Sequence, residues 1–500
     1  MGIISDLLKS GQGAAPALTA PACTPLSYDQ LRQQIAQTTY TLNALGLGRG
    51  DRIAMVLANG PQMAAAFLAV TATATVAPLN PAYRAEEFDF YLTDLGAKAL
   101  LVEVGSTSPA LAVAERQGVP VLFLAPRSET AGRFELHGRA GKPVVPSPTE
   151  EEDIALILHT SGTTARPKQV PLTQRNLYTS AHNIVKALAL TGDDRCLNLM
   201  PLFHIHGLVA GLVAGLAAGG SIFCPPGFNA LKFSSWLKEA NPTWYTAVPT
   251  MHQAILGRVA RNRDLLADTR LRFIRSSSAP LAPSVITELE ATFAAPVIEG
   301  YGMTEAAHQI TCNPLPPLPR KPGSVGIAAG PEVAILDSTG NLQPPGTIGE
   351  VGIRGENVMS GYAQNPQANA SAFSNGWFRT GDQGVLDEEG YLHITGRLKE
   401  IINRGGEKIA PREVDEVLMI HPAVAQAVTF ALPHPKLGEE VAVAIVLTAG
   451  QQASEQELRA FAAQRLADFK VPRRVVFLEQ IPTGPTGKIQ RMGLAERMLL

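Results

Sequence analysis

An alternation of helical and strand patterns over the first third of this 500-residue sequence most constrains its fold. A helical pattern begins after Ser27, which stands three residues before Gln30 as in a capping box. Further helical stretches follow at Pro61–Ala72 and Ala85–Leu95. They alternate with short apolar runs, typical of strands, at Arg52–Ala58, Ala99–Glu103, Val119–Ala125 and Ile154–His159. Because helices that alternate with apolar strands cover both faces of a parallel sheet, this order predicts doubly wound α/β layers.

The pattern changes after Gly346. Short alternating runs at Glu350–Arg354 and Gly390–Thr395, separated by glycine-rich turns, predict β-hairpins. The residues beyond Gly396–Lys399 carry their own strands and helices, enough for a small domain. The predicted fold class is α/β, with a large N-terminal domain (1–396) that includes a β-rich subdomain, and a small α+β C-terminal domain (397–500).

Charge and cysteine content exclude several kinds of partner. Lysine and arginine number 42 against 44 acidic residues, so no basic field exists to bind a nucleic acid backbone. The cysteines Cys23, Cys196, Cys224 and Cys312 lie far apart, which is typical of free thiols in a reducing compartment. The first ten residues lack the pattern of a secretory signal. We therefore expect a cytoplasmic protein that binds small molecules; monomer and homodimer both stay open.

The segment His206–Cys224 is nearly uncharged, and Gly207, Gly211, Gly215 and Gly219 recur at the spacing of a transmembrane dimer face. Its leucine and isoleucine content is low for insertion into a bilayer. We predict a buried, closely packed helix and no membrane partner.

A hydroxyl-rich loop follows the last of these strand patterns, with the sequence Thr160-Ser-Gly-Thr-Thr-Ala-Arg-Pro-Lys168. Hydroxyls and backbone N–H groups donate to phosphate oxygens, and a lysine offsets their charge, so the loop is typical of a polyphosphate site. It is not a Walker A loop, because the GxxxxGK[ST] pattern is absent. For this segment alone, a flexible turn is the alternative.

Four later segments are Tyr301-Gly-Met-Thr-Glu305, Arg379-Thr-Gly-Asp382, Gly396-Arg-Leu-Lys through Gly406, and Pro482 through Lys488. In this order, and together with the hydroxyl-rich loop, they resemble the AMP-forming acyl-activating superfamily of acyl-CoA synthetases. The resemblance extends from about Ser27 to Gln490, although Ala165 and Gln169 replace two glycines of the family's loop.

The resemblance implies that the chain uses ATP, Mg²⁺ and CoA. It assigns ATP binding to Thr160, Ser161, Gly162, Thr163, Thr164, Lys168, Ser278, Ala279, Pro280, Gly300, Tyr301, Thr304, Asp382, Arg397 and Lys488. Glu305 would hold Mg²⁺, a hard ion that prefers carboxylate and phosphate oxygens, while Thr304 contacts the α-phosphate. Taken singly, these residues have plainer explanations: an acid at a helix N-terminus, an aspartate in a turn, an exposed lysine.

Further roles follow from the same resemblance. Asp382 would accept both ribose hydroxyls with help from Arg397, and Lys488 would offset charge in the transition state. The small domain is expected to rotate about a hinge near Lys399. That rotation would replace the Lys488 loop with the segment of Gly405 and Gly406, which lines the path of the CoA thiol.

The predicted acyl pocket departs most from the family pattern. Arg275-Ser-Ser-Ser278 places hydroxyls where relatives carry glycine or alanine. His308 follows Glu305 by three residues, one turn if the helix continues. His204 is a third candidate, either for ligand contact or for packing and gating. Imidazoles and hydroxyls suit a small acid with a second carboxylate better than a fatty acyl chain.

These pocket segments resemble those of family members that act on oxalate. We predict a ligase that converts oxalate and ATP into oxalyl-AMP and pyrophosphate, after which CoA displaces AMP to give oxalyl-CoA. The predicted catalytic residues are Lys488, Thr304, Glu305 and His204. A CoA ligase for another short-chain or aromatic acid is one alternative. A nucleotide-binding regulatory protein without turnover is another, although the retained Glu305 and Lys488 argue against it.

Overall fold

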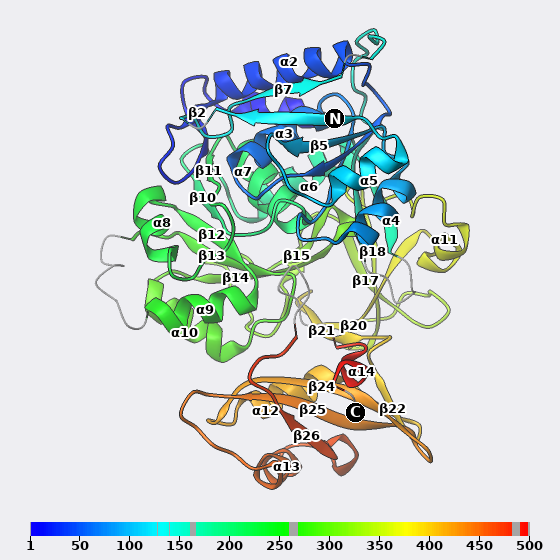
Figure 1. The fold of residues 1–500 in the computed structure, drawn as a ribbon. Coiled ribbons are helices and arrows are strands. Elements are labelled where there is room, and N and C mark those ends of the chain that lie inside the picture. The colour runs from blue at the N-terminus through cyan, green and yellow to red at the C-terminus, as the bar shows by residue number, and fades with distance from the viewer. Residues whose placement is uncertain are drawn as a thin grey trace. The chain divides into compact units, whose positions relative to one another are not determined.

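The computed structural model describes residues 2–127, 129–139, 141–160, 167–259, 269–482 and 491–498 (Figure 1). The chain divides into two compact units. Unit 1 comprises Met1–Glu332 and Arg354–Ala372, and unit 2 comprises Val333–Ile353 and Phe373–Leu500. The domain boundary that the sequence places between residues 396 and 397 lies inside unit 2, so this boundary stays a prediction.

The first sheet of unit 1 has seven strands in the order β7-β6-β5-β3-β4-β8-β9. Its parallel strands are β3 (Arg52–Val56), β4 (Thr75–Pro78), β5 (Ala99–Glu103), β6 (Val121–Pro126) and β8 (Ile154–Thr160). Antiparallel strands β7 (Phe134–Gly138) and β9 (Lys168–Thr173) form its two edges. The neighbouring helices are α2 (Tyr28–Ala44), α3 (Pro61–Thr71), α4 (Ala85–Leu95) and α5 (Ala110–Gln117). The predicted alternation of helices and strands is confirmed, including the capping box of Ser27 and Gln30.

The second sheet of unit 1 has nine strands in the order β16-β15-β14-β13-β12-β10-β11-β1-β2. These are β1 (Pro16–Thr19), β2 (Leu26–Ser27), β10 (Arg195–Asn198), β11 (Ser221–Phe223), β12 (Trp244–Ala247), β13 (Phe273–Ser277), β14 (Val297–Met303), β15 (His308–Cys312) and β16 (Ile327–Ala328). The strands from β14 to β1 are parallel, and the others are antiparallel. Its helices are α6 (Gln174–Ala187), α8 (Phe233–Ala240), α9 (Pro249–Val259) and α10 (Pro283–Phe293), of which α9 and α10 lie side by side in Figure 1.

The glycine-spaced segment begins as a π-helix, η2 (His206–Val213), and continues as α7 (Ala214–Ala217). A Cβ atom at Gly207 would lie 2.2 Å from the carbonyl oxygen of Pro201, so the close packing is confirmed. No helix in the described residues is long and apolar enough to cross a membrane. The prediction of one helix up to Cys224 is wrong, because Gly219 turns the chain at φ +81° and residues 221–223 form β11.

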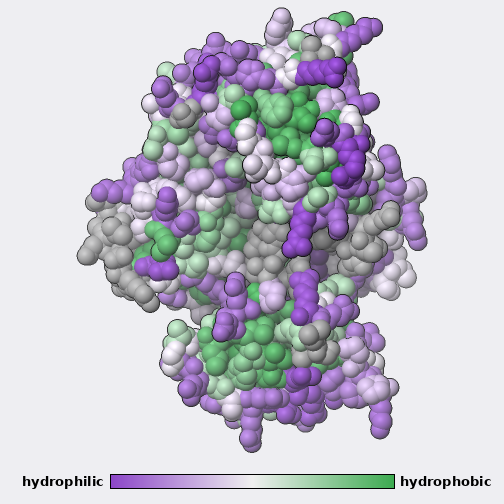
Figure 2. All heavy atoms as spheres, in the orientation of Figure 1, coloured by the Kyte–Doolittle hydropathy of each residue, from purple (hydrophilic) through white to green (hydrophobic). Residues whose placement is uncertain are grey.

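Unit 2 contains two five-stranded sheets. The first consists of β17 (Glu332–Leu336), β18 (Gly349–Arg354), β19 (Phe373–Ser374), β20 (Trp377–Leu386) and β21 (Leu392–Arg397). The second consists of β22 (Ile402–Arg404), β23 (Glu407–Ile409), β24 (Val424–His434), β25 (Gly438–Leu447) and β26 (Arg474–Phe477), with helices α12 (Pro411–Met419) and α13 (Glu455–Ala463). The predicted runs Glu350–Arg354 and Gly390–Thr395 overlap β18 and β21, and both of these strands pair antiparallel with β20. Figure 2 shows apolar side chains gathered over β24, β25 and β26. The predicted α/β fold class is confirmed.

Candidate active site

A buried cluster of polar side chains connects η2 with strands β12, β13 and β15. His206, the first residue of η2, has no exposed surface. Its Nδ1 lies 3.0 Å from Ser278 Oγ, and its Nε2 lies 2.6 Å from Thr246 Oγ1. The imidazole ring of His308 lies 4.9 Å from that of His206, between ring centroids. The cluster therefore joins two buried imidazoles to the partly buried hydroxyl of Ser278, in surroundings where hydrogen bonds and charges act strongly.

His308 reaches this cluster because the chain reverses just before it. The helix does not continue from Glu305 to His308: a 3₁₀ turn covers only Thr304–Ala306, and His308 begins β15. Ala307 and His308 have φ angles of +48° and +95°, and Ser278 has +74°. Non-glycine residues in this left-handed region store strain, which proteins concentrate at functional sites.

The predicted ATP residues Ser278–Pro280 follow the carboxyl end of β13, and Gly300 and Tyr301 lie in the adjacent strand β14. Ser277 Oγ donates a hydrogen bond to the Gly300 carbonyl oxygen at 2.7 Å. Since ligands bind at the carboxyl ends of parallel strands, the structure brings these residues together at the edge where a binding site is expected.

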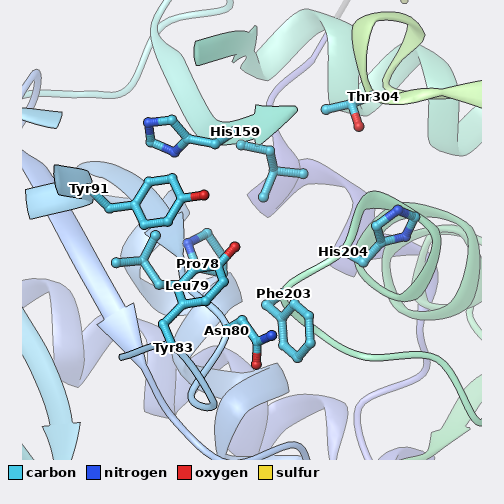
Figure 3. Close-up of a pocket in the computed structure, with 10 residues that line it drawn as sticks. Pro78, Leu79, Asn80, Tyr83, Tyr91, His159, Phe203, His204 and Thr304 are labelled. Carbon is cyan, nitrogen blue, oxygen red and sulfur yellow. The ribbon is translucent and has the colours of Figure 1, made fainter. Parts of the chain in front are cut away.

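His204 lies beside the cluster and lines a cavity of about 50 Å³. Its Nδ1 accepts a hydrogen bond from the His206 backbone N–H at 3.3 Å. In Figure 3, His204 and Thr304 lie across this cavity from Tyr91 and His159. The cavity therefore contains two of the four predicted catalytic residues, His204 and Thr304.

The cavity wall also explains one departure from the family's loop. His159 Nε2 lies 2.9 Å from Asp94 Oδ2, and burial lowers the pKa of this histidine. Gln169, which replaces a family glycine, donates to the same carboxylate oxygen at 2.7 Å and to the Asp94 backbone carbonyl at 2.6 Å. The glutamine thus fixes Asp94 beside His159.

Glu305 is buried, and its Oε1 accepts a hydrogen bond from the Tyr362 hydroxyl at 3.0 Å. Lys168 Nζ lies 4.4 Å from the centre of the same tyrosine ring, and Lys168 pairs with Thr160 across β8 and β9. Tyr362 therefore connects the end of the hydroxyl-rich loop with the predicted magnesium ligand. Sequence reasoning missed Tyr362, since no motif marks it. The predicted residues Ser161, Gly162, Thr163 and Thr164 lie outside the described residues.

In unit 2, Asp382 and Arg397 stand opposite each other on β20 and β21. Arg397 Nε lies 2.9 Å from Asp382 Oδ1; the aspartate is buried, whereas the arginine is mostly exposed. The alternative that Asp382 lies in a turn is wrong, because β20 continues through it.

The other predicted residues of unit 2 lie in turns. Lys399 follows β21, and Gly405 and Gly406 connect β22 to β23 with φ angles of +60° and +100°. Glycine tolerates such angles without strain. Lys488 lies outside the described residues.

Residues 9–363 match the model of the AMP-binding enzyme family, and residues 413–488 match the model of the AMP-binding enzyme C-terminal domain. The chain belongs to the AMP-binding enzyme family. The family predicted from the sequence motifs is confirmed.

This AMP-binding enzyme is 47% identical over 508 residues to an oxalate–CoA ligase of Arabidopsis thaliana, covering 99% of the chain and 98% of that protein. It is 42% identical to an oxalate–CoA ligase of Saccharomyces cerevisiae, covering 90% of the chain and 87% of that protein. The crystal structure of ATP-bound MatB from Rhodopseudomonas palustris superimposes with a TM-score of 0.89 at 30% identity. That match covers 99% of the chain and 98% of MatB.

The number of side chains that could act as metal ligands bears on how this AMP-binding enzyme would hold Mg²⁺. Among the residues that the structure describes, no group of three or more His, Cys, Asp or Glu side chains could hold a metal ion. Mg²⁺ commonly binds through one or two carboxylates, with substrate phosphates and water as further ligands. The single buried carboxylate of Glu305 fits Mg²⁺ on those terms, with phosphate oxygens of the nucleotide as further ligands.

Proposed function

We propose that this AMP-binding enzyme is an oxalate–CoA ligase. It joins oxalate and ATP to give oxalyl-AMP and pyrophosphate, and CoA then displaces AMP to give oxalyl-CoA. The observation that carries the proposal is the buried pairing of His206 and His308 beside Ser278, which offers polar groups to a second carboxylate. The identity to two oxalate–CoA ligases over nearly the whole chain supports it.

In the proposed first step, one carboxylate of oxalate attacks the α-phosphate of ATP while the histidine cluster holds the other. Thr304 contacts the α-phosphate, Asp382 accepts the ribose hydroxyls with Arg397 beside it, and Lys488 offsets the charge that develops in the transition state. Glu305, held by the Tyr362 hydroxyl, would bind Mg²⁺, which neutralises phosphate charge when present. His204 contacts the ligand or gates the adjoining cavity.

The second step needs a different arrangement of the same pocket. We propose that residues 397–500 move as a domain about a hinge near Lys399, so that Gly405 and Gly406 line the path of the CoA thiol. We also propose a cytoplasmic location, which agrees with the free thiols of Cys196, Cys224 and Cys312 that are typical of a reducing compartment.

Pyrophosphate release measured with a panel of acids tests the substrate assignment. Oxalate should exceed acetate, butyrate and coumarate in kcat/KM by up to about 10⁴-fold, because a monocarboxylate leaves buried polar groups unsatisfied. Malonate should fail for lack of room. His308→Ala should weaken oxalate activation far more than ATP binding. A wild-type enzyme that prefers a monocarboxylate would overturn the oxalate assignment and leave the ligase class standing.

Separate assays of the two half-reactions test the role of Lys488. Lys488→Ala should abolish adenylate formation and leave thioester formation from supplied oxalyl-AMP largely intact, because only the first step needs this cation. Equal loss in both half-reactions would contradict the two-arrangement mechanism. Oxalate-dependent formation of AMP, rather than ADP, distinguishes the ligase from a regulatory nucleotide-binding protein.

A further inference from the structure

Arg275 is a buried cation in the middle of the nine-stranded sheet. It lies on β13, has no exposed surface, and donates one hydrogen bond, from Nη2 to Gln309 Oε1 at 2.8 Å. Within the ranges that the structure describes, its Nε and Nη1 have no hydrogen-bond partner, and no acidic side chain forms an ion pair with it. An arginine with this burial and so few partners needs a physical explanation.

The neighbours of Arg275 do not supply a negative charge. Its electrostatic neighbours are the thiols of Cys196 and Cys312. Burial raises the pKa of Cys196 well above its ordinary value and that of Cys312 to about 11, so both thiols are neutral at pH 7. Burial also lowers the pKa of Arg275, but a guanidinium stays protonated in proteins. The protein therefore holds an uncompensated positive charge, which opposes folding.

Two short connections join Arg275 to the histidine cluster. Thr246 pairs with Arg275 across β12 and β13, and paired residues of parallel strands face the same side of a sheet. Thr246 Oγ1 in turn lies 2.6 Å from His206 Nε2. On the other side, Gln309, which accepts the hydrogen bond from Arg275, directly follows His308. One intervening residue, Thr246 for His206 and Gln309 for His308, thus connects Arg275 with each histidine of the cluster.

We propose that Arg275 is a positioning residue that selects doubly charged acids over singly charged ones. The proposal rests on the proposed acid site at His206, Ser278 and His308. The second carboxylate of a bound dianion supplies the negative charge that the surrounding side chains lack. Charges in a protein interior interact over several ångströms, so Arg275 favours that carboxylate without touching it. A monoanion, whose single carboxylate reacts with ATP, gains nothing from this charge.

The test compares Arg275→Met with a matched variant on the same segment, Arg272→Met. Arg272 is partly exposed and forms an ion pair with Asp194 at 2.6 Å, so its removal changes the net charge equally. The kcat and KM values are measured separately for oxalate, for its monoanionic analogue glyoxylate, and for ATP. Arg275→Met should raise the KM for oxalate roughly 10- to 100-fold and leave those for glyoxylate and ATP unchanged. Arg272→Met should not change the oxalate-to-glyoxylate ratio.

Thermal unfolding provides the second readout. Replacing a buried charge by an apolar side chain of similar volume is often neutral or stabilising, so Arg275→Met should unfold at or above the wild-type temperature. Arg275→Met that fails to fold, or that loses activity equally with both acids, would show a structural role and overturn the proposal. If the wild-type enzyme prefers oxalate and Arg275→Met leaves the oxalate-to-glyoxylate ratio unchanged, the proposal is also overturned. A wild-type enzyme that prefers glyoxylate would instead contradict the proposed function, and with it the acid site on which Arg275 acts.

Discussion

The two sheets of unit 1 share a parallel construction, yet they bury different side chains. In the seven-stranded sheet the fully buried strand residues that face one helical layer are apolar, as at Ala54, Leu100 and Val102. In the nine-stranded sheet, equally buried strand positions carry Thr246, Arg275 and Gln309. Burial of polar groups costs stability unless each is well paired. The difference indicates that the strands of the first sheet mainly supply an apolar core, whereas those of the second carry buried polar side chains beside the candidate acid site.

The largest expected effect comes from placing a polar group in the seven-stranded sheet, the apolar sheet of unit 1. Leu100→Asn puts an amide where the structure offers only apolar neighbours, and it should lower the free energy of unfolding by about 4 kcal/mol. Urea unfolding monitored by circular dichroism measures this. Leu100→Met, which keeps the volume and polarity, should cost less than about 1.5 kcal/mol. If both variants were equally stable, the apolar character of this sheet would have no structural importance.

Sequence patterns predicted the apolar sheet well because its signals are local. Helix α4 begins and ends at the predicted residues Ala85 and Leu95, and β5 matches the predicted strand Ala99–Glu103. In each case, the spacing of apolar residues within a short window specifies the element.

The nine-stranded sheet, the polar sheet of unit 1, was predicted less well because its contacts are long-range. Nothing near His206 shows that its imidazole meets Thr246 and Ser278, 40 and 72 residues later. The helical spacing from Glu305 to His308 was misleading, since the left-handed backbone at Ala307 ends the turn. The polar residues Arg275, Ser276 and Ser277 also gave no sign of their burial, which depends on packing from other parts of the chain.

The next prediction concerns a histidine buried against the polar sheet. His252, on α9, is fully buried, with Tyr245 Oη 3.3 Å from its Nδ1. Burial lowers its pKa from 6.5 to about 3. The unfolded chain binds the proton of His252 more readily than the folded protein does. The free energy of unfolding is therefore highest above pH 6.5 and decreases as the pH falls toward 3. Between pH 6.5 and 5 the loss should be about 2 kcal/mol.

Thermal unfolding at several pH values measures this loss. In His252→Gln, which has no titrating group at this position, the acid-dependent decrease should be smaller than in wild type by that amount. Leu100→Met serves as the control in the apolar sheet and should follow the wild-type pH profile. Parallel profiles for wild type and His252→Gln would mean that the folded protein accommodates the imidazolium, and the contrast between the sheets would not extend to acid stability.

The smallest expected effect separates a hydroxyl that has a partner from one that has none. Thr246 Oγ1 holds His206, whereas Ser276 Oγ is buried on β13 without a hydrogen-bond partner among the described residues. Thr246→Val keeps the side-chain shape and removes the contact, so it should lower kcat/KM for oxalate about 10-fold, equivalent to about 1.4 kcal/mol. Ser276→Ala removes a buried group that gains nothing from folding, so it should leave kcat/KM unchanged and raise the free energy of unfolding by up to about 1 kcal/mol. Steady-state kinetics and urea unfolding of both variants decide the matter. Equal losses of activity would mean that the polar character of β12 and β13 as a whole, rather than the orientation of His206, supports oxalate activation.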